Sequence, residues 1–174
     1  TKQERDDQYG HLLYQEVADT SDDQKFEVVP PGVNEEVFNQ KASVIDIQQI
    51  SKLDAISGLS GKPAIVVSSR LDKKKNIHGV VQAYSRSKVL RNAASLVLCI
   101  RGIDDPKKDI FNLANEEKKV LRGIVDIIDS SAIGHQVYFL NISSQLELAA
   151  TYRYFARRGS VFALTSLYEP FGLA

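Results

Sequence analysis

The sequence lacks several features that would assign it to a common functional class. Its 174 residues contain a single cysteine, Cys99, within an apolar run, which excludes a disulfide framework. We expect Cys99 to be a buried structural thiol rather than a nucleophile. Apolar runs such as residues 96–100 are far too short to span a bilayer, and no secretory signal is recognisable. We therefore predict a cytoplasmic protein without a membrane partner.

Net charge is also absent, because 22 Lys and Arg residues balance 22 Asp and Glu residues. A neutral chain has no long-range field to attract nucleic acid, so any anion-binding site must be local. The sequence begins with Thr1 and contains no methionine, from which we expect a fragment of a longer protein.

The motifs of several enzyme classes are missing too. The sequence has no G-x-G-x-x-G, no Walker sequence and no G-x-S-x-G elbow. The three histidines, His11, His78 and His135, are far apart and lack ligand spacing, so we predict no metal site. The paired aspartates 104–105 precede a proline, where such residues more often start a turn or cap a helix than hold a metal.

What the sequence does contain, from residue 63 onward, is a regular alternation of apolar strands and amphipathic helices. Strands are expected at 64–69, 95–101, 136–140 and 159–165, and helices at 76–90, 112–130 and 143–157. The strands are continuous apolar runs, which indicates burial on both faces and a parallel sheet covered by helices. We predict an α/β fold with a doubly wound, Rossmann-like parallel sheet that binds its ligand at the carboxyl ends of the strands.

The segment before residue 63 is less regular. Residues 1–27 are polar, with an apolar helical face at 12–17, and are expected to form a helix and a loop. Residues 26–34 are typical of a short strand that two prolines and a glycine halt. Residues 35–57 have mixed helical periodicity, and residues 57–63 form a flexible break.

Two charged residues, Arg70 and Lys75, follow the first expected strand, where the next helix begins. A helix N-terminus flanked by cations suits a phosphate, although a run of lysines is more often a solvated surface loop. Glu169 follows the last expected strand, beside Pro170 and Gly172. Its carboxylate could accept hydrogen bonds from sugar hydroxyls, or it could cap the next helix.

Three motifs together resemble one enzyme family. They are V-V-P-P-G-V-N at 28–34, S-S-R-L-D-K-K-K-N at 68–76 and E-P-F-G-L-A at 169–174. In order and spacing they resemble the retaining GT-B glycosyltransferases that include sucrose-phosphate synthase and sucrose synthase. T-K-Q-E-R at 1–5 is similar to the end of the acceptor domain in sucrose-phosphate synthases, and G-S-V-F-A-L-T-S-L-Y at 159–168 is close to the bacterial members.

The resemblance implies two facing Rossmann-like domains, with the donor held mainly by the carboxyl-terminal one. Residues 1–27 would then end the amino-terminal acceptor domain, 28–62 would be the interdomain linker and lead-in segment, and 63–174 the first half of the donor-nucleotide-binding domain. The missing amino-terminal domain of the same chain would be a partner.

The resemblance also implies a reaction. The parent would transfer glucose from UDP-glucose to fructose 6-phosphate with retention, without a cofactor, and the fragment alone would be inactive. Alternatives are a related retaining glycosyltransferase, such as sucrose synthase or an ADP-glucose user, and a non-catalytic module that binds a sugar nucleotide.

Finally, the resemblance implies roles for individual residues. Arg70 and Lys75 would contact the donor diphosphate, and Glu169, the first Glu of the family's E-x₇-E motif, would contact the transferred glucose; these three are the predicted catalytic residues. Arg5 could reach the phosphate of the acceptor. Further donor contacts are predicted at Gly102, Leu140, Phe171, Gly172 and Leu173.

Overall fold

The structure is a computed structural model that describes residues 5–6, 9–10, 21, 24 and 32–167. The chain divides into two units, Thr1–Val33 with Glu169–Leu173, and Asn34–Tyr168 with Ala174. Most of the helix expected within 1–27 lies outside the described residues. So do residues 26–31 of the short strand expected at 26–34. The sheet and its helices belong to the second unit.

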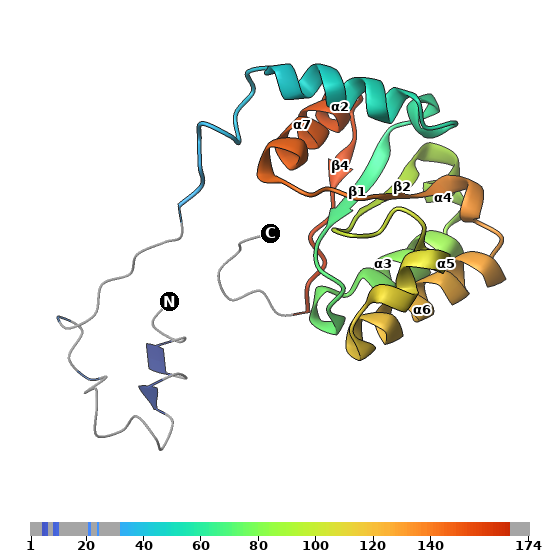
Figure 1. The fold of residues 1–174 in the computed structure, drawn as a ribbon. Coiled ribbons are helices and arrows are strands. Elements are labelled where there is room, and N and C mark those ends of the chain that lie inside the picture. Colours follow the sequence, from blue (N-terminus) through green and yellow to red (C-terminus); the bar gives the residue numbers. More distant parts are fainter. Residues whose placement is uncertain (1–4, 7–8, 11–20, 22–23, 25–31, 168–174) are drawn as a thin grey trace. The chain divides into compact units, whose positions relative to one another are not determined.

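Four parallel strands form the sheet of this unit (Figure 1). They are β1 (Ala64–Ser68), β2 (Ser95–Cys99), β3 (Val137–Leu140) and β4 (Val161–Phe162), in the order β3-β2-β1-β4. Val66 of β1 lies between Val97 of β2 and Phe162 of β4. The predicted α/β fold with a parallel sheet is confirmed.

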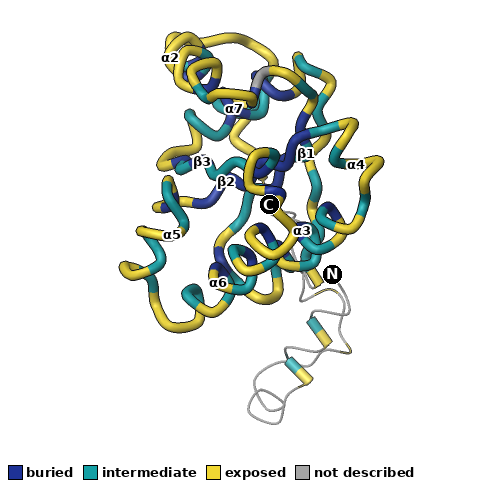
Figure 2. Tube along the Cα trace, turned by 90° about the vertical axis from the view of Figure 1, so that its right-hand side faces the viewer, coloured by how far each residue is buried: buried dark blue, intermediate teal, exposed yellow. Residues whose placement is uncertain are grey.

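Helices cover both faces of the sheet. α3 (Ile77–Arg86) and α6 (Asn115–Ser130) pack on the face that carries Val67 and Leu98. α2 (Val44–Asp54) and α7 (Gln145–Ala156) pack on the opposite face, which carries Val66 and Val97. Figure 2 shows buried residues along β1 and β2, between helices whose outer sides are exposed. The domain boundaries drawn from the sequence remain predictions.

The helix expected at 76–90 is broken, and this prediction is wrong. α3 ends at Arg86, and a second helix, α4 (Lys88–Ala93), begins after Ser87. Ser87 has a non-helical backbone, with φ −100° and ψ 101°, and its Oγ accepts a hydrogen bond from the N–H of Leu90 at 3.2 Å. Serine favours this N-cap arrangement over a helix interior, which explains the break.

The last strand also differs from expectation. β4 contains only two residues instead of seven, and Val161 and Phe162 are 59% and 44% exposed rather than buried on both faces. Among the described strands β4 pairs with β1 alone, so it is an edge strand there. An extended segment continues beside β1, because the N–H of Ala163 donates to the carbonyl of Val66 at 2.9 Å.

Short elements connect the strands to the helices. They are η2 (Leu59–Gly61), η3 (Lys73–Lys75), α5 (Pro106–Asp109), η4 (Ile110–Asn112) and η5 (Gly134–Gln136). Cys99 is 3% exposed, and burial raises the pKa of its thiol to about 12, so its predicted burial is confirmed. In the described part of the chain no helix is both long and apolar enough to cross a membrane.

Candidate functional site

The topology predicts a ligand-binding site at the carboxyl ends of β1 and β4. The chain leaves β1 for α3 on one face of the sheet, whereas α7, which leads into β4, lies on the other face. The two strands are neighbours, so the winding direction of the sheet changes between them. Open α/β sheets bind their ligands at such a point.

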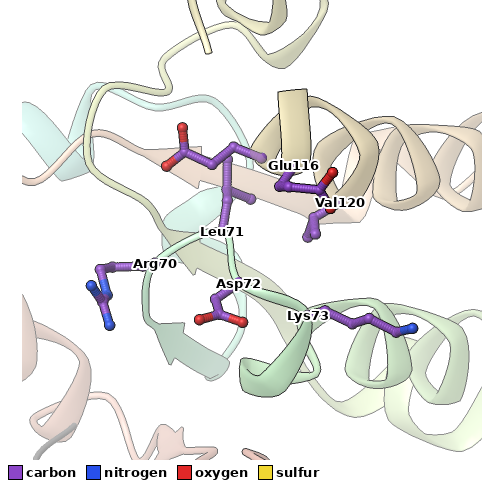
Figure 3. A pocket seen from close by; sticks show the side chains of 7 residues that line it. Arg70, Leu71, Asp72, Lys73, Glu116 and Val120 are labelled. Carbon is purple, nitrogen blue, oxygen red and sulfur yellow. The ribbon is translucent and has the colours of Figure 1, made fainter. Parts of the chain in front are cut away.

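The loop after β1 projects Arg70 from this edge. Leu71 is 6% exposed and packs into the core beneath α3 and α6, and Asp72 Oδ1 accepts the N–H of Lys74 at 2.8 Å. Arg70 itself is exposed. Figure 3 shows the Arg70 guanidinium and the Lys73 ammonium pointing to opposite sides of this loop. Leu71 and the capped turn therefore hold the backbone from which the exposed Arg70 side chain projects.

Lys75 ends the η3 turn of the same loop, and its N–H donates to the carbonyl of Asp72 at 3.0 Å. Asn76 follows with a left-handed φ of 54° and starts α3. The structure thus places both predicted cations, Arg70 and Lys75, in one short loop at the carboxyl end of β1. Their role as diphosphate contacts remains a prediction.

The segment after β4 is attached to this loop. The N–H of Leu167 donates to the carbonyl of Lys74 at 2.8 Å. The chain that leads to Glu169 therefore departs from beside the Arg70 and Lys75 loop. Glu169, Phe171, Gly172 and Leu173 themselves lie outside the described residues.

A cavity of about 380 Å³ adjoins the loop on the side of α6 (Figure 3). It is lined by Arg70, Leu71, Asp72, Lys73, Glu116, Glu117 and Val120. Its lining carries charges of both signs, and Glu116 already pairs with Lys119 at 2.6 Å. Carboxylates in the wall disfavour an anion, so this cavity is a poorer phosphate site than the exposed Arg70 side of the loop.

The ends of β2 and β3 are joined by one amide side chain. Asn141 Oδ1 accepts the N–H of Gly102 at 2.7 Å, and Asn141 Nδ2 donates to Asp104 Oδ2 at 2.9 Å. Gly102 has a φ of 80°, in the left-handed region that glycine adopts readily. The structure therefore brings together Gly102 and the segment of Leu140, both predicted donor contacts.

Leu140 has its side chain in the core, where it is 4% exposed, and its carbonyl accepts the N–H of Ile100 at 3.0 Å. Its predicted contact with the donor remains untested. The sequence analysis missed Asn141, although a polar amide directly after an apolar strand was a usable signal.

Of the paired aspartates after β2, Asp105 is the N-cap of α5. Asp105 precedes α5 and accepts the N–H of Lys107 at 3.1 Å, and Asp109 Oδ2 accepts the N–H groups of Asp104 and Asp105, each at 2.8 Å. A hydrogen bond from Lys108 is the largest cause that lowers the pKa of Asp105. The prediction that this pair starts a turn or caps a helix is confirmed. Among the described residues, no group of three His, Cys, Asp or Glu side chains could hold a metal.

Arg5 belongs to the first unit of the chain. Its Nε pairs with Asp6 Oδ1 at 2.9 Å. Its predicted contact with an acceptor phosphate is untested.

Comparison with known proteins identifies the family. Residues 49–174 match the family of glycosyl transferases group 1, and the chain belongs to that family. The resemblance to glycosyltransferases that the motifs indicate is thereby confirmed.

Individual relatives show which members of the family are similar to this chain. A probable sucrose-phosphate synthase from Thermosipho melanesiensis is 36% identical over 174 residues, which cover 100% of this chain and 34% of that protein. A sucrose synthase from Nitrosomonas europaea is 31% identical over 168 residues, which cover 87% of this chain and 20% of that one. The chain thus spans about a third or less of the length of these relatives.

A solved structure shares the fold. The sucrose-phosphate synthase from Thermosynechococcus elongatus superposes with a TM-score of 0.59 at 22% identity, over 84% of this chain and 31% of that one. The likeness supports the GT-B type of α/β fold.

Proposed function

We propose that these residues form the donor-binding part of a retaining hexosyltransferase that transfers glucose from UDP-glucose to fructose 6-phosphate. The products are sucrose 6-phosphate and UDP. Support comes from the family, from the relatives named as sucrose-phosphate synthases, and from the cations at the carboxyl end of β1. A cytoplasmic location, suggested by composition, belongs to the same proposal.

In this reaction the bond between the anomeric carbon and a UDP oxygen breaks, and a bond to the acceptor hydroxyl oxygen forms on the same face. UDP leaves with increased negative charge, and its departing oxygen accepts the proton of the acceptor hydroxyl. Arg70 and Lys75 would stabilise that charge, so neither a metal nor another cofactor is required in the proposal. Glu169 would accept hydrogen bonds from the hydroxyls of the glucosyl group.

One observation carries the proposal, the hydrogen bond of 2.8 Å between the Leu167 N–H and the Lys74 carbonyl. It ties the segment that continues to Glu169 to the loop of Arg70 and Lys75. Residues 70 and 169 are far apart in sequence, yet one donor must contact the groups that bind its diphosphate and its sugar. The attachment supports a shared site for both halves of a sugar nucleotide.

The test is an assay of the full-length protein with UDP-glucose and ADP-glucose, each against fructose and fructose 6-phosphate. We expect product from UDP-glucose and fructose 6-phosphate, with nuclear magnetic resonance showing an α-glucosidic bond. The 174 residues alone should form no product, because a partial site cannot orient both substrates. If neither donor transferred its glucosyl group to either acceptor, the transferase proposal would be rejected.

A second candidate is a sucrose synthase that uses free fructose, since relatives with that name also match. The same assay separates the two, because a sucrose synthase would prefer fructose over fructose 6-phosphate. A non-catalytic binding module would bind UDP-glucose and leave it intact.

A further inference from the structure

We infer that a second cavity, between the starts of α3 and α6, binds a neutral mono- or disaccharide. The cavity has a volume of about 570 Å³. That volume lies within the range of small-molecule sites, which is roughly 300–1,000 Å³. The inference goes beyond the proposed function and does not depend on it.

This cavity lies on the side of the β1 loop that faces away from the Arg70 guanidinium. Lys73 lines it and Arg70 does not. Figure 3 shows the Lys73 ammonium pointing away from the Arg70 guanidinium. The cavity shares part of its wall with the smaller cavity described above, through Asp72, Lys73, Glu116 and Val120. A ligand bound here would therefore leave the Arg70 side of the loop open.

Two polar side chains at the cavity wall lie close against glycines. Asn76 has a left-handed φ of 54°, and a Cβ atom added at Gly79 would overlap Asn76 Oδ1. A Cβ atom added at Gly123 of α6 would lie 3.2 Å from Cδ2 of His78. Gly79 thus leaves room for the Asn76 amide, and Gly123 for the His78 ring. The absence of side chains at these two positions lets both polar groups occupy the junction of α3 and α6.

These two side chains and Lys73 have hydrogen-bonding capacity to offer a ligand. Within the described part of the chain, the side chains of Lys73, Asn76 and His78 form no ion pair or hydrogen bond. An ammonium group donates, an amide donates and accepts, and a neutral imidazole does one of each at its two nitrogens. The cavity therefore presents both donors and acceptors that the protein itself does not use.

The charges around the cavity disfavour an ionic ligand. The carboxylates of Asp72 and Glu116 would repel an anion, and the ammonium groups of Lys73 and Lys119 would repel a cation. Glu116 and Lys119 already pair with each other at 2.6 Å. Hydroxyl groups both donate and accept hydrogen bonds, so a neutral ligand with several hydroxyls can use side chains of either charge.

Apolar residues supply the rest of the contact that a sugar ring needs. Ile77, Val120 and Leu167 also line the cavity, and Ile77 is only 1% exposed. A sugar ring carries C–H groups beside its hydroxyls, and these can pack against apolar side chains. A combination of apolar walls with a few polar groups is typical of small-molecule sites. A saccharide is the chemical class that matches both parts of this lining.

The test is saturation-transfer nuclear magnetic resonance on the full-length protein, with glucose and maltose as neutral probes. UDP and fructose 6-phosphate are added in excess to fill the proposed donor and acceptor sites. We expect saturation of the C–H protons of at least one sugar, with a Kd in the millimolar range. Inorganic phosphate should not displace that sugar, because an anion would meet the carboxylates of Asp72 and Glu116.

Variants locate the site. Asn76→Gly removes the amide while glycine readily keeps the left-handed φ, and it should raise the Kd of the sugar about fivefold. His78→Ala truncates an exposed side chain and should have a similar effect. The matched controls Asn112→Gly and His135→Ala change exposed residues that do not line the cavity, so they should leave the Kd unchanged. Thermal unfolding followed by circular dichroism checks that each variant is folded.

Three results would overturn the inference. They are the absence of saturation transfer to either sugar, an unchanged Kd in folded Asn76→Gly and His78→Ala, and displacement of the sugar by phosphate. The variants, and not the added substrates, identify the cavity as the binding site. A protein without transferase activity could therefore still bind the sugar here, and failure of the proposed function would leave this inference standing.

Discussion

Replacing Arg153 with methionine should strongly destabilise the packing of α7 on α2. The Arg153 guanidinium bonds Asp46 twice, from Nε to Oδ1 at 2.6 Å and from Nη2 to Oδ2 at 2.8 Å. Their side chains are only 11% and 3% exposed. Nη1 also donates to the carbonyls of Val37 at 3.2 Å and Asn39 at 3.1 Å. One guanidinium therefore connects α7, α2 and the segment before α2.

The magnitude follows from the charge that the substitution leaves behind. Methionine replaces much of the arginine stem, but within the described part of the chain the buried Asp46 carboxylate keeps only its hydrogen bonds from Ser43 N at 2.8 Å and Ser43 Oγ at 2.7 Å. Removing one partner of a buried ion pair costs about 3–5 kcal/mol of unfolding free energy. For a unit of this size that lowers Tm by roughly 10 °C or more.

Urea unfolding followed by circular dichroism measures the effect, and a double variant tests its cause. Arg153→Met with Asp46→Leu removes both charges and should recover most of the lost stability, less about 1 kcal/mol for the N-terminal cap of α2. Glu116→Gln breaks an exposed pair with Lys119 and should change stability very little. If the double variant were as unstable as Arg153→Met, an uncompensated buried charge would not be the cause.

The same pair predicts acid sensitivity. The hydrogen bond from Arg153 is the largest cause that holds the pKa of Asp46 well below its ordinary value of 3.8, against the opposing effect of burial. Because the folded-state pKa is depressed, the stabilisation is complete above that ordinary value and is lost as the pH falls below it. The stability difference between the unaltered protein and Arg153→Met should therefore shrink between pH 5 and pH 2. A constant difference would contradict the assignment.

Three further predictions concern the proposed donor site and the end of α4. Arg70→Ala or Lys75→Ala in the full-length protein should each lower turnover by about 100-fold, while a chelator has little effect; the reverse pattern in a steady-state assay would exclude metal-free catalysis. Glu169→Gln should weaken UDP-glucose binding and leave UDP binding nearly unchanged, whereas a lowered Tm with an unchanged affinity ratio would show a helix cap. Tyr84→Phe removes the 2.9 Å bond from Tyr84 Oη to the Ala94 carbonyl and should cost about 1 kcal/mol in urea unfolding; no loss would mean that water replaces the hydroxyl.

Strand positions could be predicted from the sequence because the core strands are uniformly apolar. The four apolar residues of β2, 96–99, are all buried, so their hydrophobicity reports burial directly. The break at Ser87 could not be predicted in the same way. The apolar residues Val89 and Leu90 continue the helical pattern beyond it, yet they are 77% and 38% exposed. Hydrophobic periodicity does not show whether an apolar residue meets a partner.

The length of β4 is set by its pairing with β1 and could not be predicted from the apolar composition of residues 159–165. Residues 159–165 are as apolar as a buried strand, but ladder pairing with β1 involves only Val161 and Phe162. The Phe162 ring still packs against Tyr152 on α7, with 5.3 Å between ring centroids. Whether an apolar strand is central or at an edge is a property of the sheet, which local sequence does not contain.

The candidate site was predictable where it follows from position along the chain, and not where side chains meet across loops. Arg70 and Lys75 come directly after an apolar strand, so the rule for parallel sheets locates them at the carboxyl edge. The Asn141 amide is hydrogen-bonded to Gly102 and Asp104, which precede it by 39 and 37 residues. Only the alignment of β2 with β3 makes that bridge possible.

The strand order also explains why the loop after β1 and the segment after β4 lie side by side. With the order β3-β2-β1-β4, the two chain segments leave adjacent strands and meet in the hydrogen bond between Leu167 and Lys74. If β4 had instead added next to β3, three strand spacings, or about 15 Å, would separate it from β1. That distance exceeds the reach of a single hydrogen bond, and β2 and β3 would then separate the two segments. The reversal of winding at β1 is therefore what allows the loop of Arg70 and Lys75 to meet the segment that follows β4 at Leu167.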